Sequence, residues 1–179
     1  MRTCFALVLL ASLGLAGCAT DGTTSVGSPP PAPIADAGNA AFRKADFAWS
    51  TSPGKGEIDG QLTFKQGAVA YGCAEAGVVL TPETPWVRRR MEILYTSADK
   101  ATLPAAEVRA RTPPERNQDY STFVKRATCD AAGHFNFGAL ADGAWYVLTV
   151  ARPVAPGTGV DMSIMRRVVV KGGKVKLTL

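Results

Sequence analysis

The sequence predicts an all-β fold, a domain of short strands packed as a sandwich of two sheets. Three observations predict it. Glycine and proline are abundant, at 18 and 12 of 179 residues, and both favour turns over long helices. Short segments of alternating apolar and polar residues recur along the chain, which is the pattern of strands with one buried face. Asp and Gly residues separate these segments at intervals of about 8–12 residues, as in β-sandwiches.

Five strands and one hairpin make up the predicted fold. The strands are the segments 57–64, 77–81, 122–128, 134–137 and 145–150. Alternation places Phe135 and Phe137 on the buried face of the fourth strand. The segment 167–179 predicts the hairpin, because Gly172 and Gly173 suit a two-residue primed turn between two alternating runs.

The composition limits the functions that the chain can have. Hydrophobic residues make up 46% and charged residues 20% of the chain, which is typical of a folded globular protein and excludes a fully disordered one. Four cysteines are too few for a disulfide-built miniprotein. A single histidine, His134, excludes any site that needs two imidazoles. The sequence contains no metal-ligand or catalytic motif, so it predicts neither a cofactor nor an enzyme.

The first 17 residues are typical of an export signal. Arg2 supplies a positive charge, and an eleven-residue apolar stretch, 5–15, follows it. A helix that spans a bilayer needs about 20 residues, so this stretch is too short to cross a membrane. It instead predicts the apolar part of a signal peptide.

The residues that end this segment, Leu15-Ala16-Gly17-Cys18, resemble the lipobox of bacterial lipoproteins. The resemblance implies cleavage before Cys18, which then carries a thioether-linked diacylglycerol and an N-acyl chain. Two or more acyl chains anchor a protein stably, whereas a single chain does not. Ala19 is not the aspartate that retains lipoproteins at the inner membrane of enteric bacteria. The resemblance therefore implies the periplasmic face of the outer membrane. The alternatives are an ordinary secretory signal and a plain transmembrane anchor.

Residues 18–41 predict a disordered tether between the lipid and the folded domain. They contain no Lys, Arg or aromatic residue, and four prolines cluster at 29–33, so the segment cannot bury a core. Of the 20 basic and 15 acidic residues of the chain, Arg2 and two aspartates precede residue 42. The domain at 42–179 therefore has 19 basic and 13 acidic residues, a net charge of +6. This charge favours acidic partners in the envelope, or solubility alone.

Four segments of the predicted domain follow the order found in the carboxypeptidase regulatory-like domain. They are 57–60 (EIDG), 76–82 (AGVVLTP), 129–137 (CDAAGHFNF) and 140–150 (LADGAWYVLTV). The sequence resembles this family over residues 57–82 and 122–179. The resemblance implies a seven-stranded prealbumin-like β-sandwich, an Ig-like two-sheet architecture.

The family resemblance also implies structural roles for individual residues, and it brings no catalytic residue. Three glycines would take tight backbone positions: Gly60, Gly133 and Gly143. Four apolar residues would fill the core: Phe135, Phe137, Tyr146 and Leu148. Such domains are accessory modules in enzymes and serve binding or scaffolding elsewhere.

An insertion at 83–121 departs from the family, which crosses here in a short connection. Its segment 86–95 (WVRRRMEILY) can form either one amphipathic helix or a strand. Four apolar residues would share one face of the helix: Val87, Met91, Leu94 and Tyr95. Residues 112–120 predict an exposed loop. An insertion of this size on a common scaffold is where recognition of a particular partner is expected.

Cys73 and Cys129 predict a disulfide. Cys73 precedes the predicted strand 77–81, and Cys129 follows the predicted strand 122–128. If these strands are antiparallel neighbours, the start of the first lies beside the end of the second, and the two cysteines meet. An exported protein lies in an oxidising compartment, where such a pair forms a bond. The alternative is a pair of buried free thiols.

The candidate interaction residues lie in the insertion. Arg88, Arg89 and Arg90 form a basic run that could bind phosphate or carboxylate groups, although such runs are more often solvated. Trp86 precedes the run and is a candidate interface residue if its ring is exposed. The basic run and the tryptophan are therefore the predicted interaction site.

Two other polar features have no predicted catalytic role. Glu57 and Asp59 alternate along one strand, so they share an exposed face. His134 lies beside the inward-facing Phe135 and is therefore expected to point to solvent. Neither feature belongs to a nucleophile–base constellation.

These observations predict a non-enzymatic binding or scaffold module of the cell envelope, anchored by lipid, with a protein or glycan partner and no nucleic acid. Three alternatives stay open. A component of a glycan-acting enzyme would need converging carboxylates with a raised pKa. A role in a secretion apparatus rests on analogy with a transthyretin-like lipoprotein of type VI secretion. A direct polysaccharide binder would show a row of exposed Trp and Tyr side chains on one sheet.

Overall fold

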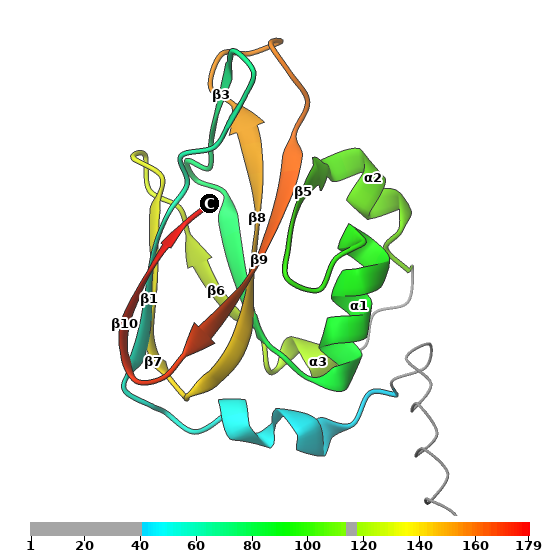
Figure 1. Ribbon diagram of the computed structural model, residues 1–179, viewed down its shortest axis with the longest axis vertical. Coiled ribbons are helices and arrows are strands. Elements are labelled where there is room, and N and C mark those ends of the chain that lie inside the picture. The colour runs from blue at the N-terminus through cyan, green and yellow to red at the C-terminus, as the bar shows by residue number, and fades with distance from the viewer. Residues whose placement is uncertain (1–40, 114–117) are drawn as a thin grey trace, which may run out of the picture. The chain divides into compact units, whose positions relative to one another are not determined.

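The computed structural model describes residues 41–113 and 118–179 (Figure 1). The predicted signal peptide, Cys18 and all but the last residue of the predicted tether lie outside the described residues and remain predictions. Within the described ranges, no helix is both long and apolar enough to cross a membrane.

The smaller of two packed sheets has three strands. Its order is β10 (Gly173–Thr178), β1 (Gly56–Gln61) and β7 (His134–Leu140). The central strand β1 runs antiparallel to β7 and parallel to β10. Gly60 of β1 has no side chain, and an added Cβ would overlap the ring of Phe135 on β7. The predicted tight position of Gly60 therefore lets the Phe135 ring lie across the sheet.

The larger sheet is antiparallel and lies beside the smaller one, which is at the left in Figure 1. Its main strands follow the order β6 (Lys125–Thr128), β4 (Gly77–Pro82), β8 (Gly143–Pro153), β9 (Met162–Val170) and β5 (Lys100–Pro104). A short hairpin consists of β2 (Lys65–Gln66) and β3 (Val69–Gly72), and β3 pairs with the C-terminal end of β8.

An inner core fills the space between the two sheets. Ile58, Leu80 and Trp145 are fully buried there, and Phe135 and Phe137 face them from β7. The predicted all-β sandwich is thus confirmed. The described residues form ten strands, and seven remain when the β2–β3 hairpin and β5 are set aside.

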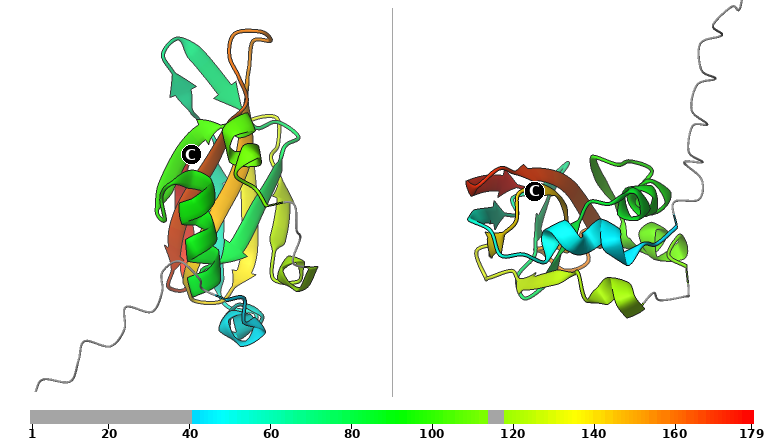
Figure 2. Two further views of the ribbon diagram at one scale, coloured as in Figure 1. Left: turned by 90° about the vertical axis from the view of Figure 1, so that its right-hand side faces the viewer. Right: turned by 90° about the horizontal axis from the view of Figure 1, so that it is seen from below.

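The inserted segment forms a helical layer on the outer face of the larger sheet (Figure 2). Its main helix, α1 (Pro85–Tyr95), begins where the Thr84 hydroxyl accepts a hydrogen bond from the Val87 N–H, with proline at the first helical position. The four residues expected on one helix face are indeed the buried ones: Val87, Met91, Leu94 and Tyr95. Of the two structures that the sequence allowed, the helix is therefore present.

Shorter helices complete this layer. The 3-10 helix η1 (Lys44–Ser50) precedes β1, while α2 (Ala105–Ala110) and α3 (Gln118–Ser121) belong to the insertion. The insertion also adds β5 to the edge of the larger sheet. The predicted loop at 112–120 is only partly described, because 114–117 lie outside the described residues, and its last part is helix α3.

An outer core lies between the larger sheet and the helical layer, and it corrects one prediction. Tyr146 and Leu148 were expected between the two sheets, but they face the helices, where Tyr146 is fully buried. Trp145 and Val147 occupy the inner core instead. Strand β8 is covered on both faces, so alternation alone could not assign its sides.

The predicted hairpin at 167–179 is wrong in its pairing, although its turn is right. Gly172 and Gly173 both have φ of +69°, as a primed turn requires. The flanking strands nevertheless belong to different sheets, since β9 pairs with β8 and β5 whereas β10 pairs with β1. Strand β5 covers β9 only from Met162 to Arg166, and after Val170 the chain crosses to the edge of β1 instead of turning back along β9.

Candidate functional site

A disulfide joins Cys73 and Cys129 at one end of the sandwich, which we call the loop end. The loop end consists of the turns at 73–76 and 130–133, the β8–β9 loop at 154–161 and the β2–β3 hairpin. The Cα atoms of the two cysteines are 5.7 Å apart, so the predicted disulfide is confirmed.

The predicted reason for this disulfide is also confirmed. Strands β4 and β6 are antiparallel neighbours, with Gly77 opposite Thr128. Beyond this pair, the Cys129 N–H donates to the carbonyl of Ala76 at 3.0 Å, and the Glu75 N–H donates to the carbonyl of Cys129 at 2.9 Å. The backbone thus brings the two half-cystines together.

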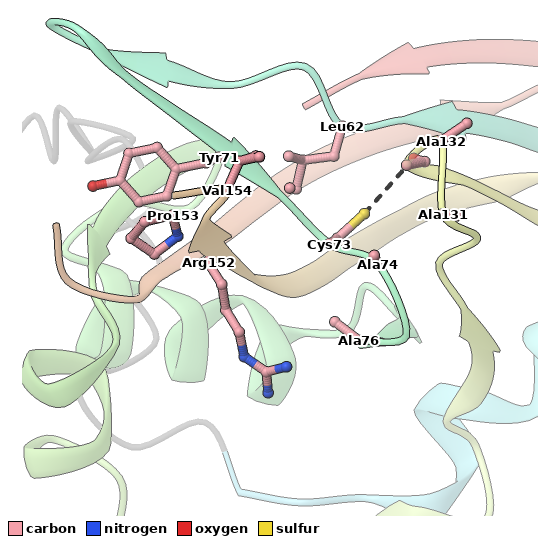
Figure 3. A pocket seen from close by; sticks show the side chains of 12 residues that line it. Leu62, Tyr71, Cys73, Ala74, Ala76, Ala131, Ala132, Arg152, Pro153 and Val154 are labelled. Atoms are coloured by element: carbon pink, nitrogen blue, oxygen red, sulfur yellow. Dashed lines mark hydrogen bonds between the residues drawn. The ribbon is translucent and has the colours of Figure 1, made fainter. Parts of the chain in front are cut away.

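A cleft of about 420 Å³ opens beside this disulfide (Figure 3). Its walls include four small side chains, namely Ala74, Ala76, Ala131 and Ala132. Leu62 and the buried Tyr71 contribute a larger apolar surface. Sites for small molecules commonly measure about 300–1,000 Å³, so the cleft can hold a small ligand.

Arg152 supplies the charge of this cleft. Among the described residues that line it, Arg152 is the only charged one. Its side chain is 64% exposed, and its Nε lies 3.9 Å from Asp161 Oδ2. A long ion pair in solvent contributes little, so the guanidinium can exchange Asp161 for a ligand.

The β8–β9 loop next to the cleft carries exposed apolar side chains. Val154 is 69% exposed and lines the cleft, while Val160 is 62% exposed on the same loop. The large hydrophobic side chains that are exposed in the described ranges are aliphatic: Ile93, Val154, Val160 and Val169. The described residues therefore lack the exposed aromatic row expected of a direct polysaccharide binder.

The predicted interaction site, Trp86 with the arginine run, lies on α1, which follows β4 and lies away from the β2–β3 hairpin (Figure 1). The half-buried Trp86 ring contacts Phe42 at 5.4 Å and Tyr120 at 4.9 Å between ring centroids. Phe47, which is fully buried, stacks on Phe123 at 4.6 Å. These aromatic rings attach η1 and α3 to the first turn of α1.

The structure divides the arginine run. Arg88 contacts Glu83 at 3.1 Å and Glu92 at 3.7 Å, and the hydrogen bond to Glu83 raises the pKa of the Arg88 guanidinium. Arg89 contacts Glu92 at 3.4 Å, while its Nε is buried without a hydrogen-bond partner. Both guanidinium groups are thus partly neutralised by carboxylates.

Arg90 differs from its two neighbours. Its guanidinium lies over the Trp86 ring, 5.6 Å from the centroid. Among the described residues, no carboxylate is within ion-pair distance of Arg90. Arg126 on β6 likewise has no carboxylate within ion-pair distance among the described residues. The sequence alone does not single out Arg126, because its position depends on how β6 pairs with β4, and no local sequence pattern shows that pairing.

The carboxylates and the histidine named from the sequence form no catalytic group. Glu57 and Asp59 both face Lys174 on β10, at 3.0 and 3.8 Å. Hydrogen bonds from Lys174 and Asn136 lower the pKa of Glu57. His134 is exposed, as predicted, with its Nε2 3.3 Å from Gln61 Nε2. The described residues also contain no His, Cys, Asp and Glu cluster able to hold a metal ion.

One comparison with a solved structure supports the fold. No protein-family model and no curated protein matches the sequence, so the carboxypeptidase regulatory-like family is not shown. A crystal structure from Pseudomonas aeruginosa, called a "putative carbohydrate binding protein", is similar with a TM-score of 0.56 and 24% identity, over 77% of this chain and 97% of that one. The minor pilin of Streptococcus agalactiae gives a TM-score of 0.32 and 15% identity, over 73% of this chain and 44% of that one.

Proposed function

We propose that this chain is a non-enzymatic, lipid-anchored module of the bacterial cell envelope that binds a short glycan in the cleft at the loop end. The observation that carries the proposal is the cleft itself, which has a rigid disulfide at one wall and small side chains around an arginine. A site of this kind is largely formed before the ligand arrives, which lowers the entropic cost of binding.

The chemistry of the cleft suits a sugar. The alanine and leucine side chains offer apolar surface to the C–H groups of a ring, and Arg152 offers several N–H donors to hydroxyl or acidic groups. A cleft that holds one or two sugar rings needs no row of exposed aromatic residues, unlike a surface that binds a polymer along its length. The carbohydrate-related name of the structure from P. aeruginosa agrees with this proposal.

The lipid anchor rests on the sequence. Cys18 in its lipobox, followed by Ala19, supports attachment to the periplasmic face of the outer membrane. Changing Cys18→Ala should move the protein from the membrane fraction to the soluble fraction. Membranes should be washed at high salt, which removes protein held only by charge. Retention of the variant in washed membranes would contradict lipid anchoring.

The geometry favours binding over hydrolysis. Glycoside hydrolysis needs a carboxylic acid with a raised pKa near a second carboxylate. Glu57 has the opposite property, because Lys174 lowers its pKa and keeps it ionised. Among the described residues, those that line the cleft include no carboxylate.

A protein partner is the second candidate, and one observation favours it. Val154 and Val160 expose apolar surface beside the cleft, which is typical of a contact site for another protein. Replacing Val160, which does not line the cleft, with serine should weaken capture of a protein partner and leave the binding of a soluble glycan unchanged.

The glycan proposal is tested by filling the cleft. Soluble Cys18→Ala protein would be titrated calorimetrically with peptidoglycan fragments and with lipopolysaccharide core oligosaccharides. Ala132→Trp places an indole in the cleft and should lower affinity more than tenfold, because the ligand and the ring compete for one space. Ala106→Trp on the exposed face of α2 is the matched control and should bind like the parent. Equal binding by both tryptophan variants would overturn the proposal.

A further inference from the structure

Two arginines far apart in the sequence lie on the helix-covered side of the larger sheet, and neither has a carboxylate partner among the described residues. Arg90 lies on α1, over the ring of Trp86. Arg126 lies on β6, where it is opposite Val79 of β4. Among the described residues, neither arginine has an ion pair, whereas Arg88 and Arg89 are paired.

The register of β6 determines the side on which Arg126 projects. The next residue, Ala127, packs against the inner core, so Arg126 projects from the outer face of the larger sheet. Thr81 is two residues along β4 from Val79 and therefore points to that same outer face. The Tyr120 hydroxyl donates to Thr81 Oγ1 at 2.8 Å, which places the phenol beside Arg126.

The electrostatics of Tyr120 agree with this arrangement. Burial raises the pKa of the Tyr120 phenol, while the hydrogen bond with Thr81 and the charges of Arg90 and Arg126 act in the opposite direction. Both guanidinium groups thus act on one phenol. We call Trp86, Arg90, Tyr120 and Arg126 together the entry surface.

The position of the entry surface suggests what it contacts. Phe42, the second described residue, packs on Trp86 at 5.4 Å, so the chain enters the folded domain beside this surface. Helices η1 and α3 lie at this end of the sandwich, whereas the β2–β3 hairpin and the β8–β9 loop lie at the other end (Figures 1 and 2). The residues that precede the entry carry the predicted lipid site, Cys18.

We propose that the entry surface binds the phosphate groups of anionic phospholipids at the membrane. Arginine binds phosphate oxygens with two parallel N–H donors, and tryptophan is favoured at the interface between lipid and water. The domain charge of +6 adds a long-range attraction to an anionic bilayer. Contact at this surface points the cleft away from the membrane, towards ligands in the periplasm.

This inference does not depend on the glycan or on the lipid at Cys18, so soluble Cys18→Ala protein can test it. The protein would be sedimented with vesicles of phosphatidylglycerol and phosphatidylcholine, and with vesicles of phosphatidylcholine alone. We expect binding to the anionic vesicles only, and weaker binding as salt increases. The double variant Arg90→Gln, Arg126→Gln should lower the partition coefficient about thirtyfold, since each basic residue near such a surface contributes about 1 kcal/mol.

Two control variants make the result specific. Arg152→Gln removes one positive charge at the far end and should change vesicle binding less than threefold. Arg90→Lys, Arg126→Lys keeps the charge and should retain most of the binding, which separates lost charge from lost fold. The proposal fails if the parent does not bind anionic vesicles, or if Arg152→Gln lowers binding as much as the double glutamine variant. It also fails if an acidic polysaccharide such as polygalacturonate binds the entry surface in preference to the vesicles.

Discussion

The two ends of the sandwich are stabilised by different means. The loop end has a disulfide, short turns and alanine side chains, and it leaves a cleft of about 420 Å³. The opposite end, where the chain enters the domain and which we call the entry end, is filled by aromatic rings: Phe47 stacks on Phe123 and is tilted against Phe42. A covalent bond fixes backbone geometry without occupying much space, whereas aromatic packing fixes it by filling space. The loop end is therefore suited to receive a ligand, and the entry end is suited to hold the domain in place.

The largest expected effect is the loss of the disulfide. The bond joins residues separated by 56 positions, so changing both Cys73 and Cys129 to alanine should lower the free energy of unfolding by about 4 kcal/mol. The cleft should also lose glycan affinity, because the turn at 73–76 lines it and is no longer held. Urea unfolding and calorimetric titration measure the two effects. Unchanged affinity in a destabilised variant would show that the disulfide does not shape the cleft.

Phe47→Ala tests the entry end and should have a somewhat smaller effect. Phe47 is fully buried, but its neighbours Phe42, Tyr120 and Phe123 are only partly buried and can move into the space. We expect a loss of about 3 kcal/mol in unfolding free energy, at the lower end for such substitutions. Glycan affinity at the opposite end should be unchanged. A loss of affinity in folded Phe47→Ala protein would show that the two ends are coupled.

The smallest expected effect is the alkaline sensitivity of the helical layer. Burial, together with the nearby charge of Glu83, raises the pKa of Tyr146 to about 12, and its hydroxyl donates to the Ala98 carbonyl at 2.8 Å. Below pH 10 both folded and unfolded chains keep this proton, so stability is unaffected. Between about pH 10 and 12 the unfolded chain loses it first, and stability should fall by about 1.4 kcal/mol per pH unit.

Tyr146→Phe is the control for this pH dependence. It should lower stability at neutral pH by about 1 kcal/mol, because the Ala98 carbonyl loses its donor. Above pH 10 the free energy of unfolding of the variant should fall less steeply with pH than that of the parent, as measured by denaturant unfolding at several pH values. Burial raises the pKa of Tyr95 and Tyr120 as well, so a smaller slope should remain. An unchanged slope would exclude Tyr146 as its source.

Local sequence patterns predict the inner face of the sandwich and the disulfide. Alternation places Phe135 and Phe137 correctly because each strand of the smaller sheet buries one face. The disulfide follows from two strands and their antiparallel pairing. Strand β8 is covered on both faces, and for such a strand alternation does not show which side faces which layer.

Other features could be predicted only with further signals or not at all. The helix at α1 remained one of two possibilities, although Thr84 followed by Pro85 is a helix-start signal that favours it. The partner of β10 depends on which strand edges are open, and turn chemistry does not report this. The cleft has no sequence signature, because alanines line its walls. The position of Arg126 on the same side of the sheet as Tyr120 follows only from the pairing of β6 with β4.

Hydrogen exchange on the lipidated protein tests most directly whether the two ends have separate partners. The protein would be compared in anionic vesicles and in neutral detergent, each with and without the glycan that binds best. We expect the vesicles to slow exchange at 86–91 and 119–126 and to leave 72–76 and 130–133 unchanged, and the glycan to do the reverse. Protection of the cleft turns by the vesicles, or of the entry surface by the glycan, would contradict it.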